Sequence, residues 1–414
     1  MTATRVRLSG ADTIDASSAE PRRDQEVHVD GDRITWAGPR TEAPPFADAR
    51  TLELRGAFLL PGLGDAHAHL MFLSPVLPGP HNIAAHMAHC LKTAQAALSG
   101  GFTTLRLVAE GARIDVALRD LFNSGALPGP RLFVAGEALS PSGGHAVDRE
   151  EYWGIRKCDG EEGWRKAARD QIQAGADHIK AIVTGGVIGH PQDVVDATTV
   201  VPAELEAAAQ VAHSRGRPLV VHASSAAGAR LAMKVGARSI EHGYFLDDDT
   251  LGELAATGTY LTPTLSITHQ VPSQLTDEYE RTAFAARGRQ PWGVKRAEES
   301  LARHERTFRR AMELGVKIIA GSDYSPYPNA GHCELAFMVR AGMSPWQAIV
   351  AATQSLADAL GVGDKLGTVT AGKWADLIAV PADPLRDIRS LREPVLVMRG
   401  GVIAKDLVSE QGVP

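Results

Sequence analysis

The central part of the chain alternates short β-branched runs with alanine-rich segments of helical spacing, and this alternation constrains the fold more than any other feature. Eight such runs begin at residues 58, 102, 131, 178, 218, 239, 259 and 316. Strands that alternate with helices form parallel sheets with right-handed crossovers, and eight such units close naturally into a barrel. We therefore predict an α/β fold, with a (β/α)₈ TIM barrel over residues 57–367.

The two ends of the chain differ from the middle, because they carry short strand-like runs separated by Gly, Pro and Asp turns. Neither end can bury both faces of its strands alone. We predict that residues 1–56 and 368–414 pair into one small composite β-sandwich domain, with the barrel domain inserted between them. The length of 414 residues accommodates a barrel of about 250 residues and this second domain.

Composition narrows the class of protein. Hydrophobic residues make up 44% of the chain and charged residues 22%, and no apolar run approaches the roughly 20 residues of a membrane span. The first residues lack the apolar core of a secretory signal, so we expect a cytoplasmic protein. A formal net charge of −6 argues against a nucleic-acid-binding surface and favours a small-molecule substrate.

The three cysteines do not suggest a disulfide framework. Cys90, Cys158 and Cys333 lie far apart in the sequence and have no CxxC spacing, which also argues against a thiolate zinc site. We expect buried free thiols.

The sequence Asp65-Ala-His67-Ala-His69 follows Pro61-Gly62 at the end of the first predicted barrel strand. Side chains two residues apart on a strand share a face, so His67 and His69 can both present nitrogens to one divalent metal ion. Two histidines at this spacing are also compatible with ordinary strand residues. The pair by itself leaves both interpretations open.

Residues of the metal-ligand type recur where later strands end. Lys180 lies in the fourth predicted strand, His222 ends the fifth, His242 ends the sixth and Asp323 ends the eighth. The carboxyl ends of parallel barrel strands meet at one mouth, where barrel enzymes hold their active sites. This convergence favours a metal site over a set of unrelated core residues.

Together with the segments PGLGDAHAH, HIKAIVTGGV, VVHA, SIEHG, GSD and GTVTAGKWADLIAV, this pattern resembles the amidohydrolase superfamily over nearly the whole chain. It is most similar to the binuclear branch of imidazolonepropionase-like proteins and Xaa-Pro dipeptidases (prolidase-like carboxypeptidases). The resemblance implies a metal-dependent hydrolase that cleaves an amide-like C–N bond in an N-acyl, carbamoyl or dipeptide substrate with a metal-bridging hydroxide. Homo-oligomers are common among such relatives.

The resemblance also assigns roles to residues. It implies that His67 and His69 bind the first of two divalent ions, and that His222 and His242 bind the second. Asp323 would ligate the first ion and transfer protons during catalysis.

Lys180 would bridge both ions after carboxylation by carbon dioxide. A neutral lysine amine can form a carbamate, whose oxygens neutralise two adjacent cations as a carboxylate would. Zinc is the expected ion, with manganese, cobalt and iron as alternatives.

Four residues are candidates for contact with the substrate. His145 follows Ser142-Gly143-Gly144, and in the dipeptidase-like relatives a histidine at this place binds substrate at the metal centre, so we predict a catalytic and substrate-binding role. Ser224 stands where several of these relatives carry a tyrosine, which weakens the case for Xaa-Pro dipeptidase activity. Tyr244 and Tyr324 are predicted to line the mouth, favouring an apolar or aromatic N-acyl or carbamoyl substrate.

Three alternative functions stay open. A mononuclear deaminase would resemble its relatives in placing a glutamate shortly after His222, whereas this chain has Ala223-Ser224-Ser225. A cyclic-amide hydrolase of the imidazolonepropionase type is a second alternative within the same superfamily. A non-catalytic barrel scaffold is the alternative from another class, but it would be expected to lack one or more ligands.

Two further histidines belong to the segment after the first barrel strand. We predict that His86 and His89 lie on the exposed surface of a helix.

Overall fold

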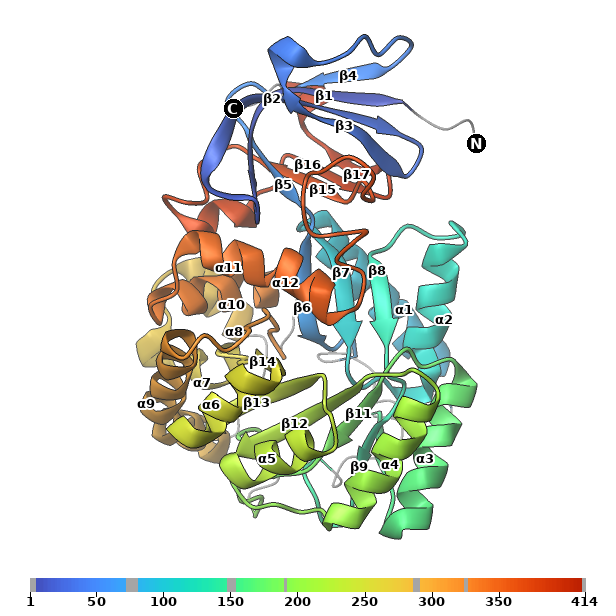
Figure 1. Cartoon of the computed structure of the whole chain (residues 1–414), viewed down its shortest axis with the longest axis vertical. Coiled ribbons are helices and arrows are strands. Elements are labelled where there is room, and N and C mark those ends of the chain that lie inside the picture. The colour runs from blue at the N-terminus through green and yellow to red at the C-terminus, as the bar shows by residue number, and fades with distance from the viewer. Residues whose placement is uncertain are drawn as a thin grey trace.

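The computed structural model describes residues 5–71, 81–146, 154–189, 192–285, 291–323 and 327–411. Figure 1 shows a sheet built from both ends of the chain, placed above a body in which strands alternate with surrounding helices. The α/β class predicted from the sequence is confirmed.

The upper sheet contains eight strands in the order β17-β16-β15-β5-β1-β2-β3, with β4 paired to β1. Its strands are β1 (Val6–Asp15), β2 (Ser18–Asp30), β3 (Arg33–Pro39), β4 (Arg50–Glu53), β5 (Phe58–Pro61), β15 (Leu377–Val380), β16 (Leu396–Arg399) and β17 (Val402–Asp406). The two ends of the chain meet where β5 pairs antiparallel with β15. The hydrogen bonding therefore forms one mixed sheet, with a hydrophobic cluster of its own that includes Leu8, Val29 and Leu377.

The body contains two parallel sheets. The first has the order β6-β7-β8, and the second has the order β10-β9-β11-β12-β13-β14. The first sheet comprises β6 (Leu63–Ala68), β7 (Phe102–Leu107) and β8 (Arg131–Val134), and the second comprises β9 (Ala138–Ser140), β10 (Ile155–Lys157), β11 (Ile179–Ile182), β12 (Leu219–Ser225), β13 (Ser239–Phe245) and β14 (Tyr260–Thr262). In the described residues, the strands expected to form one barrel are therefore found in two parallel sheets. Hydrogen bonds between strands do not run continuously around a closed barrel.

An extended segment, residues 317–323, lies between the two parallel sheets. Its first part bonds to β14, because Ile319 N donates to Leu261 O over 3.0 Å. Its second part bonds to β6, with Ala320 O accepting from Ala66 N at 2.8 Å and Asp323 N donating to His67 O at 2.7 Å. This segment is the run predicted as the eighth strand, and it joins one edge of each sheet.

The chain passes from the upper sheet into the body at Gly62. Gly62 N donates to the carbonyl oxygen of Asp376, which directly precedes β15 of the upper sheet, while Leu63 N donates to Gly101 O in the body. A Cβ atom at Gly62 would lie 2.1 Å from the Oγ1 atom of Thr103, so a glycine is required for this close approach. The run predicted as one barrel strand from residue 58 is therefore divided between two sheets.

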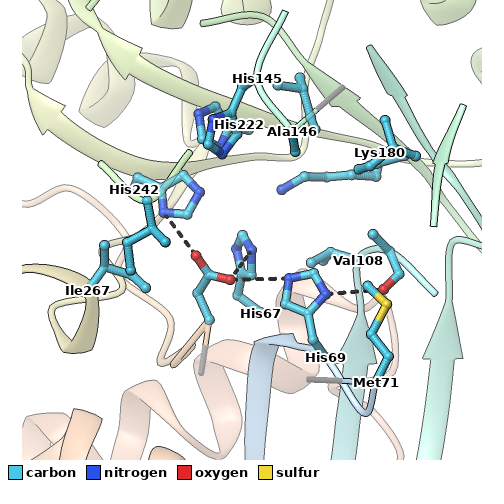
Figure 2. A pocket seen from close by; sticks show the side chains of 16 residues that line it. His67, His69, Met71, Val108, His145, Ala146, Lys180, His222, His242 and Ile267 are labelled. Carbon is cyan, nitrogen blue, oxygen red and sulfur yellow. Dashed lines mark hydrogen bonds and ion pairs between the residues drawn. The ribbon is translucent and has the colours of Figure 1, made fainter. Parts of the chain in front are cut away.

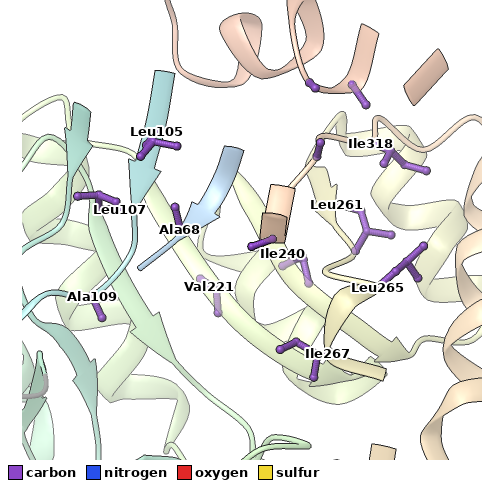
Figure 3. Packing of buried hydrophobic residues seen from close by; sticks show 14 of the residues in the cluster. Ala68, Leu105, Leu107, Ala109, Val221, Ile240, Leu261, Leu265, Ile267 and Ile318 are labelled. Carbon is purple, nitrogen blue, oxygen red and sulfur yellow. The ribbon is translucent and has the colours of Figure 1, made fainter. Parts of the chain in front are cut away.

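Helices surround the parallel sheets, as Figure 1 shows. Their bounds are α1 (Ile83–Ser99), α2 (Ile114–Asn123), α3 (Gly160–Ala174), α4 (Pro202–Ser214), α5 (Ala226–Lys234), α6 (Asp248–Thr257), α7 (Ser266–His269), α8 (Glu278–Ala285), α9 (Pro291–Glu313), α10 (Asn329–Arg340), α11 (Pro345–Ala351), α12 (Gln354–Ala359) and α13 (Val408–Gln411). Within the described ranges, no helix combines the length and apolar character needed to cross a bilayer. Aliphatic side chains of the strands form the main core between sheets and helices, and some of them are drawn in Figure 3.

One prediction about α1 was wrong. His86 is buried, with 2% of its surface exposed, rather than lying on the outer face of the helix. It shares an inward face with Cys90, Ala94 and Ala97, which follow at helical spacing and are also buried. The histidine belongs to the face of α1 that packs on the sheet.

Candidate metal centre

A pocket lies at the carboxyl ends of the parallel strands. Figure 2 shows the side chains of His67, His69, Lys180, His222 and His242 arranged around a common space. Asp323 and His145 line the same pocket. The structure therefore brings together all six residues predicted as metal ligands, and the predicted catalytic histidine.

His67 and His69 enter the pocket from the end of β6. Nδ1 of His67 lies 2.8 Å from Oε2 of Glu241, and Nδ1 of His69 lies 3.1 Å from the carbonyl oxygen of Ala109. The Nε2 atoms lie 3.5 Å and 3.1 Å, respectively, from Oδ1 of Asp323. Each imidazole thus has one nitrogen held by the protein and the other beside Asp323.

His222 and His242 show the same arrangement on β12 and β13. Nε2 of His222 lies 2.9 Å from the carbonyl oxygen of Gly185. Nδ1 of His242 lies 2.7 Å from Oγ1 of Thr264 and 3.1 Å from the hydroxyl of Tyr244. The second ring nitrogen of each histidine stays available for a ligand, and the two rings are 4.4 Å apart between centroids.

Lys180 lies on β11 and is buried, with 3% of its surface exposed. Its Nζ atom has no hydrogen-bond partner among the described residues. Burial lowers the pKa of Lys180 to about 8, although the negative charges of Glu241 and Asp323 act to raise it. The amine is therefore closer to the neutral state at physiological pH than an exposed lysine.

These side chains suit a divalent cation. Metal-binding histidines normally give their other ring nitrogen to a carboxylate, hydroxyl or backbone carbonyl, as all four histidines do here. Ligand atoms of His67, His242 and Asp323 lie within 4.8 Å of one another. The Lys180 amine, which has no hydrogen-bond partner among the described residues, could form a carbamate. The carbamate oxygens would then bind the cation. The residues present therefore fit a metal centre.

The imidazoles of His67, His222 and His242 are neutral at neutral pH, as metal ligands must be. Burial, followed by the nearby Lys180, lowers the pKa of His67 to about 4. Burial also holds the pKa values of His222 and His242 well below their ordinary range. The pocket therefore presents uncharged nitrogen donors at neutral pH.

Glu241 and Arg106 support this site, and the sequence analysis did not identify them. Burial would raise the pKa of Glu241, but Arg106 and His67 hold it below its usual range. Arg106, which is buried on β7, donates to the second carboxylate oxygen of Glu241 over 2.8 Å and to Ala66 O over 2.6 Å. The one sequence feature that could have identified Glu241 is its position directly before the predicted ligand His242.

Asp65 joins the two segments that carry His67 and Asp323. It accepts hydrogen bonds from His67 N at 2.9 Å, Ser322 Oγ at 2.6 Å and the hydroxyl of Tyr327 at 2.7 Å. Asp323 itself has a positive φ of 50°, which turns its side chain toward the histidines. The buried Asp65 therefore fixes the end of β6 relative to this turn.

His145 stands beside the histidines. Its ring stacks on His222 with centroids 4.8 Å apart, and its Nδ1 atom lies 2.5 Å from Oδ2 of Asp193. Gly186 permits this packing, because a Cβ atom there would lie 2.4 Å from Cε1 of His145. Asp193 is a further residue that sequence reasoning missed, since it lies 48 positions away in a long segment.

The other predicted substrate residues are placed differently. Ser224 is buried and donates from Oγ to Gly185 O over 2.7 Å, while Tyr244 lies behind His242 with its hydroxyl on Nδ1. Neither belongs to the described lining of the pocket. Tyr324 lies outside the described residues. The lining instead contains apolar side chains, namely Met71, Val108, Ala109, Ala138, Ala146, Ile155, Ile182, Ile188 and Ile267.

The family model named Amidohydrolase family matches residues 58–404, which is most of the chain. The chain belongs to the amidohydrolase family. The resemblance inferred from the motifs is thereby confirmed. With relatives that are named as enzymes, this amidohydrolase is a hydrolase that acts on carbon–nitrogen bonds.

Three relatives illustrate where the chain lies in the family. It is 28% identical over 438 residues to ochratoxinase from Aspergillus niger, covering 97% of this chain and 87% of that protein. It is 26% identical over 412 residues to imidazolonepropionase from Pseudomonas putida, covering 88% of this chain and 90% of that protein. Among solved structures, a Xaa-Pro dipeptidase with bound methionine superposes with a TM-score of 0.85 at 30% identity, covering 97% of this chain and 99% of that one.

Proposed function

We propose that this amidohydrolase is a binuclear metal-dependent enzyme that hydrolyses an amide-like C–N bond in a small N-acyl or carbamoyl compound with an apolar group. The observation that carries the proposal is the shared arrangement of the four pocket histidines. Each has one ring nitrogen held by a protein group, and all four rings line one pocket with Asp323 and a buried lysine whose amine has no hydrogen-bond partner among the described residues.

The proposed ligand sets follow the strands. His67, His69 and Asp323 would hold the first ion, and His222 and His242 the second. Lys180, as a carbamate, would bind between them. When bound, two divalent ions such as Zn²⁺, Mn²⁺, Co²⁺ or Fe²⁺ lower the pKa of a water molecule and polarise a carbonyl group.

Asp323 and His145 would act on the substrate. The Asp323 carboxylate accepts the proton of the attacking water and returns it to the leaving nitrogen, a transfer that typically contributes about 10²–10⁴-fold. Asp193 accepts the Nδ1–H of His145, so in the imidazolium form the Nε2–H of His145 would donate to the carbonyl oxygen as negative charge develops there.

The pocket lining supports an apolar substrate. Apart from Lys180, no lysine or arginine lines the described part of the pocket, and aliphatic side chains such as Val108, Ile182 and Ile267 make up much of its wall. A hydrophobic acyl or aryl group would bury its surface there. The relatives themselves include proteins named ochratoxinase, imidazolonepropionase and Xaa-Pro dipeptidase, so dipeptides and cyclic amides are the alternatives to test.

We further propose that the two parallel sheets act as one (β/α)₈ barrel. Segment 317–323 bonds to both sheets, and Asp177 N donates to Val134 O between β8 and the start of β11. Residues 1–56 and 368–414 would form the small β-sandwich domain, although β5 extends its sheet to Pro61. Limited proteolysis that cuts both connections and releases a folded 57–367 body would support this division.

The first test is metal analysis of protein purified with bicarbonate. The wild type should carry about two more ions per chain than Lys180→Ala, which should also lose activity. Lys295→Ala is the matched control, because this lysine is exposed on α9, where it lies 3.8 Å from Glu299. Equal metal content in the wild type and Lys180→Ala would remove the bridging role of Lys180 and favour a mononuclear deaminase.

A substrate panel is the second test. N-acyl aromatic amides and aryl ureas should be hydrolysed faster than Xaa-Pro or Xaa-Arg dipeptides. Brisk cleavage of the dipeptides, with no turnover of any amide or urea, would reject the proposed substrate class.

A further inference from the structure

A second cluster of metal-ligating side chains lies behind the pocket. Ligand atoms of His86, Cys90 and Glu110 lie within 4.8 Å of one another, and all three residues are buried. His86 and Cys90 stand one helical turn apart on the inner face of α1. Glu110 comes from the segment that follows β7. Two neighbouring elements therefore direct nitrogen, sulfur and oxygen donors to one point.

The polar atoms of this cluster lack protein partners. Among the described residues, neither ring nitrogen of His86 forms a hydrogen bond, and neither does Oε2 of Glu110. Buried polar groups without a partner are rare in folded proteins, because each loses its hydrogen bonds to water and gains none in return. Three such atoms beside one buried thiol indicate a ligand that satisfies them together.

We propose that His86, Cys90 and Glu110 bind one further divalent cation of the zinc type. A Cys90 thiolate and a Glu110 carboxylate carry two negative charges, which balance a divalent ion in a site closed to water. Neutral imidazole, thiolate and carboxylate are ligands that zinc accepts, whereas magnesium and calcium prefer oxygen alone. On binding, the S–H bond of Cys90 and the O–H bond of a protonated Glu110 break, bonds from sulfur and oxygen to the metal form, and the protons leave to solvent.

This site shares no ligand with the proposed catalytic centre, and it goes beyond the proposed function. The two are nevertheless connected through the backbone, because Glu110 accepts a hydrogen bond from Leu70 N, and Leu70 directly follows His69. The residue before Glu110, Ala109, provides the carbonyl oxygen that holds His69. A cation here would fasten α1 to the two segments that position the first ligand pair.

The test uses protein produced with cobalt as the only added transition metal. The catalytic ligand set contains no cysteine, so a thiolate-to-cobalt charge-transfer band in the near ultraviolet reports the second site alone. We expect this band in the wild type and its loss in Cys90→Ser, together with about one cobalt ion per chain. The His86→Ala and Glu110→Gln variants should weaken the band and serve if Cys90→Ser does not fold.

Matched controls separate this site from other thiols and from the catalytic centre. Cys158→Ser and Cys333→Ser also replace buried free cysteines and should retain the band. Lys180→Ala should retain it as well, even if the proposed catalytic centre proves wrong. A folded, cobalt-loaded wild type without the band, or a band that persists in Cys90→Ser, would overturn the proposal.

Discussion

The buried carboxylate of Glu241 lies 2.8 Å from Nδ1 of His67 and fixes the imidazole that begins the proposed ligand set. Its other oxygen accepts from Arg106, so one acidic group restrains the histidine and balances a buried positive charge. Glu241 therefore links metal affinity to stability, because replacing it would both release the His67 ring and leave the charge of Arg106 unbalanced.

Replacement of Glu241 by glutamine should therefore weaken metal binding about 10–100-fold, as loss of such supporting groups typically does. It should also lower the free energy of unfolding by about 3–5 kcal/mol, since Arg106 keeps a buried charge without its counter-ion. Competition with a chelator and urea unfolding measure the two effects. Glu253→Gln is the control, because this glutamate is exposed on α6. Equal metal affinity in Glu241→Gln and the wild type would contradict the proposed support of His67.

His145 is expected to act in turnover without holding metal. The His145→Gln variant should lower kcat about 10²–10³-fold, as does removal of one donor to a developing oxyanion, while metal content stays at the wild-type level. Gly186→Ala should act in the same direction, because the new Cβ atom would enter the space of the His145 ring. Gly252→Ala on α6 has no atom within 4 Å of the new methyl group and should leave kcat unchanged. Loss of metal from His145→Gln would instead make His145 a ligand.

Tyr327 is expected to contribute to stability through Asp65. The Tyr327→Phe variant removes the 2.7 Å hydrogen bond to Oδ2 of Asp65 inside the protein. We expect a loss of about 1–3 kcal/mol in the free energy of unfolding. Thermal or urea unfolding of the metal-free protein measures it. Tyr260→Phe, for which the described residues show no hydroxyl hydrogen bond, should be nearly neutral, and an equal loss in both variants would refute the role of Asp65.

His332 should make stability depend on pH. Burial lowers its pKa from 6.5 to about 3, and its neutral ring bonds to Gly100 O and to the hydroxyl of Tyr279. Because the pKa in the folded state is depressed, this stabilising contribution is present above pH 6.5 and is lost as the pH falls toward 3. The His332→Gln variant should therefore lose less stability than the wild type between pH 7 and pH 5, measured by urea unfolding without metal. The exposed His213→Gln variant should retain the wild-type slope, and an unchanged slope in His332→Gln would contradict this prediction.

The convergence of the proposed ligands could be predicted from the sequence because it depends on strand periodicity. His67 and His69 are two positions apart, and His222 and His242 lie in the consecutive parallel strands β12 and β13. These rules follow from backbone geometry and need no knowledge of distant contacts. The supporting residues Arg106 and Asp193 could not be found in this way, because their partners lie far away in the sequence and depend on tertiary packing.

Ser224 and Tyr244 depart from the expectation that they contact the substrate, because neither lines the described part of the pocket. Ser224 Oγ donates to Gly185 O, the same carbonyl oxygen that holds Nε2 of His222. Tyr244 stacks on the ring of His242, and its hydroxyl lies 3.1 Å from Nδ1 of that histidine. In both cases a contact beside the preceding histidine keeps the side chain out of the pocket lining. Such departures leave little trace in a single sequence.

The pairing of β5 with β15 has a consequence for synthesis of the chain. Only Gly62 separates the end of β5 from the start of β6, yet the antiparallel partner of β5 starts at Leu377. While the ribosome is still synthesising the residues between β5 and β15, the edge of β5 that later pairs with β15 has no partner strand. The upper sheet is therefore completed only when nearly the whole chain has emerged, and a nascent chain stopped before residue 377 would expose an open strand edge just ahead of His67.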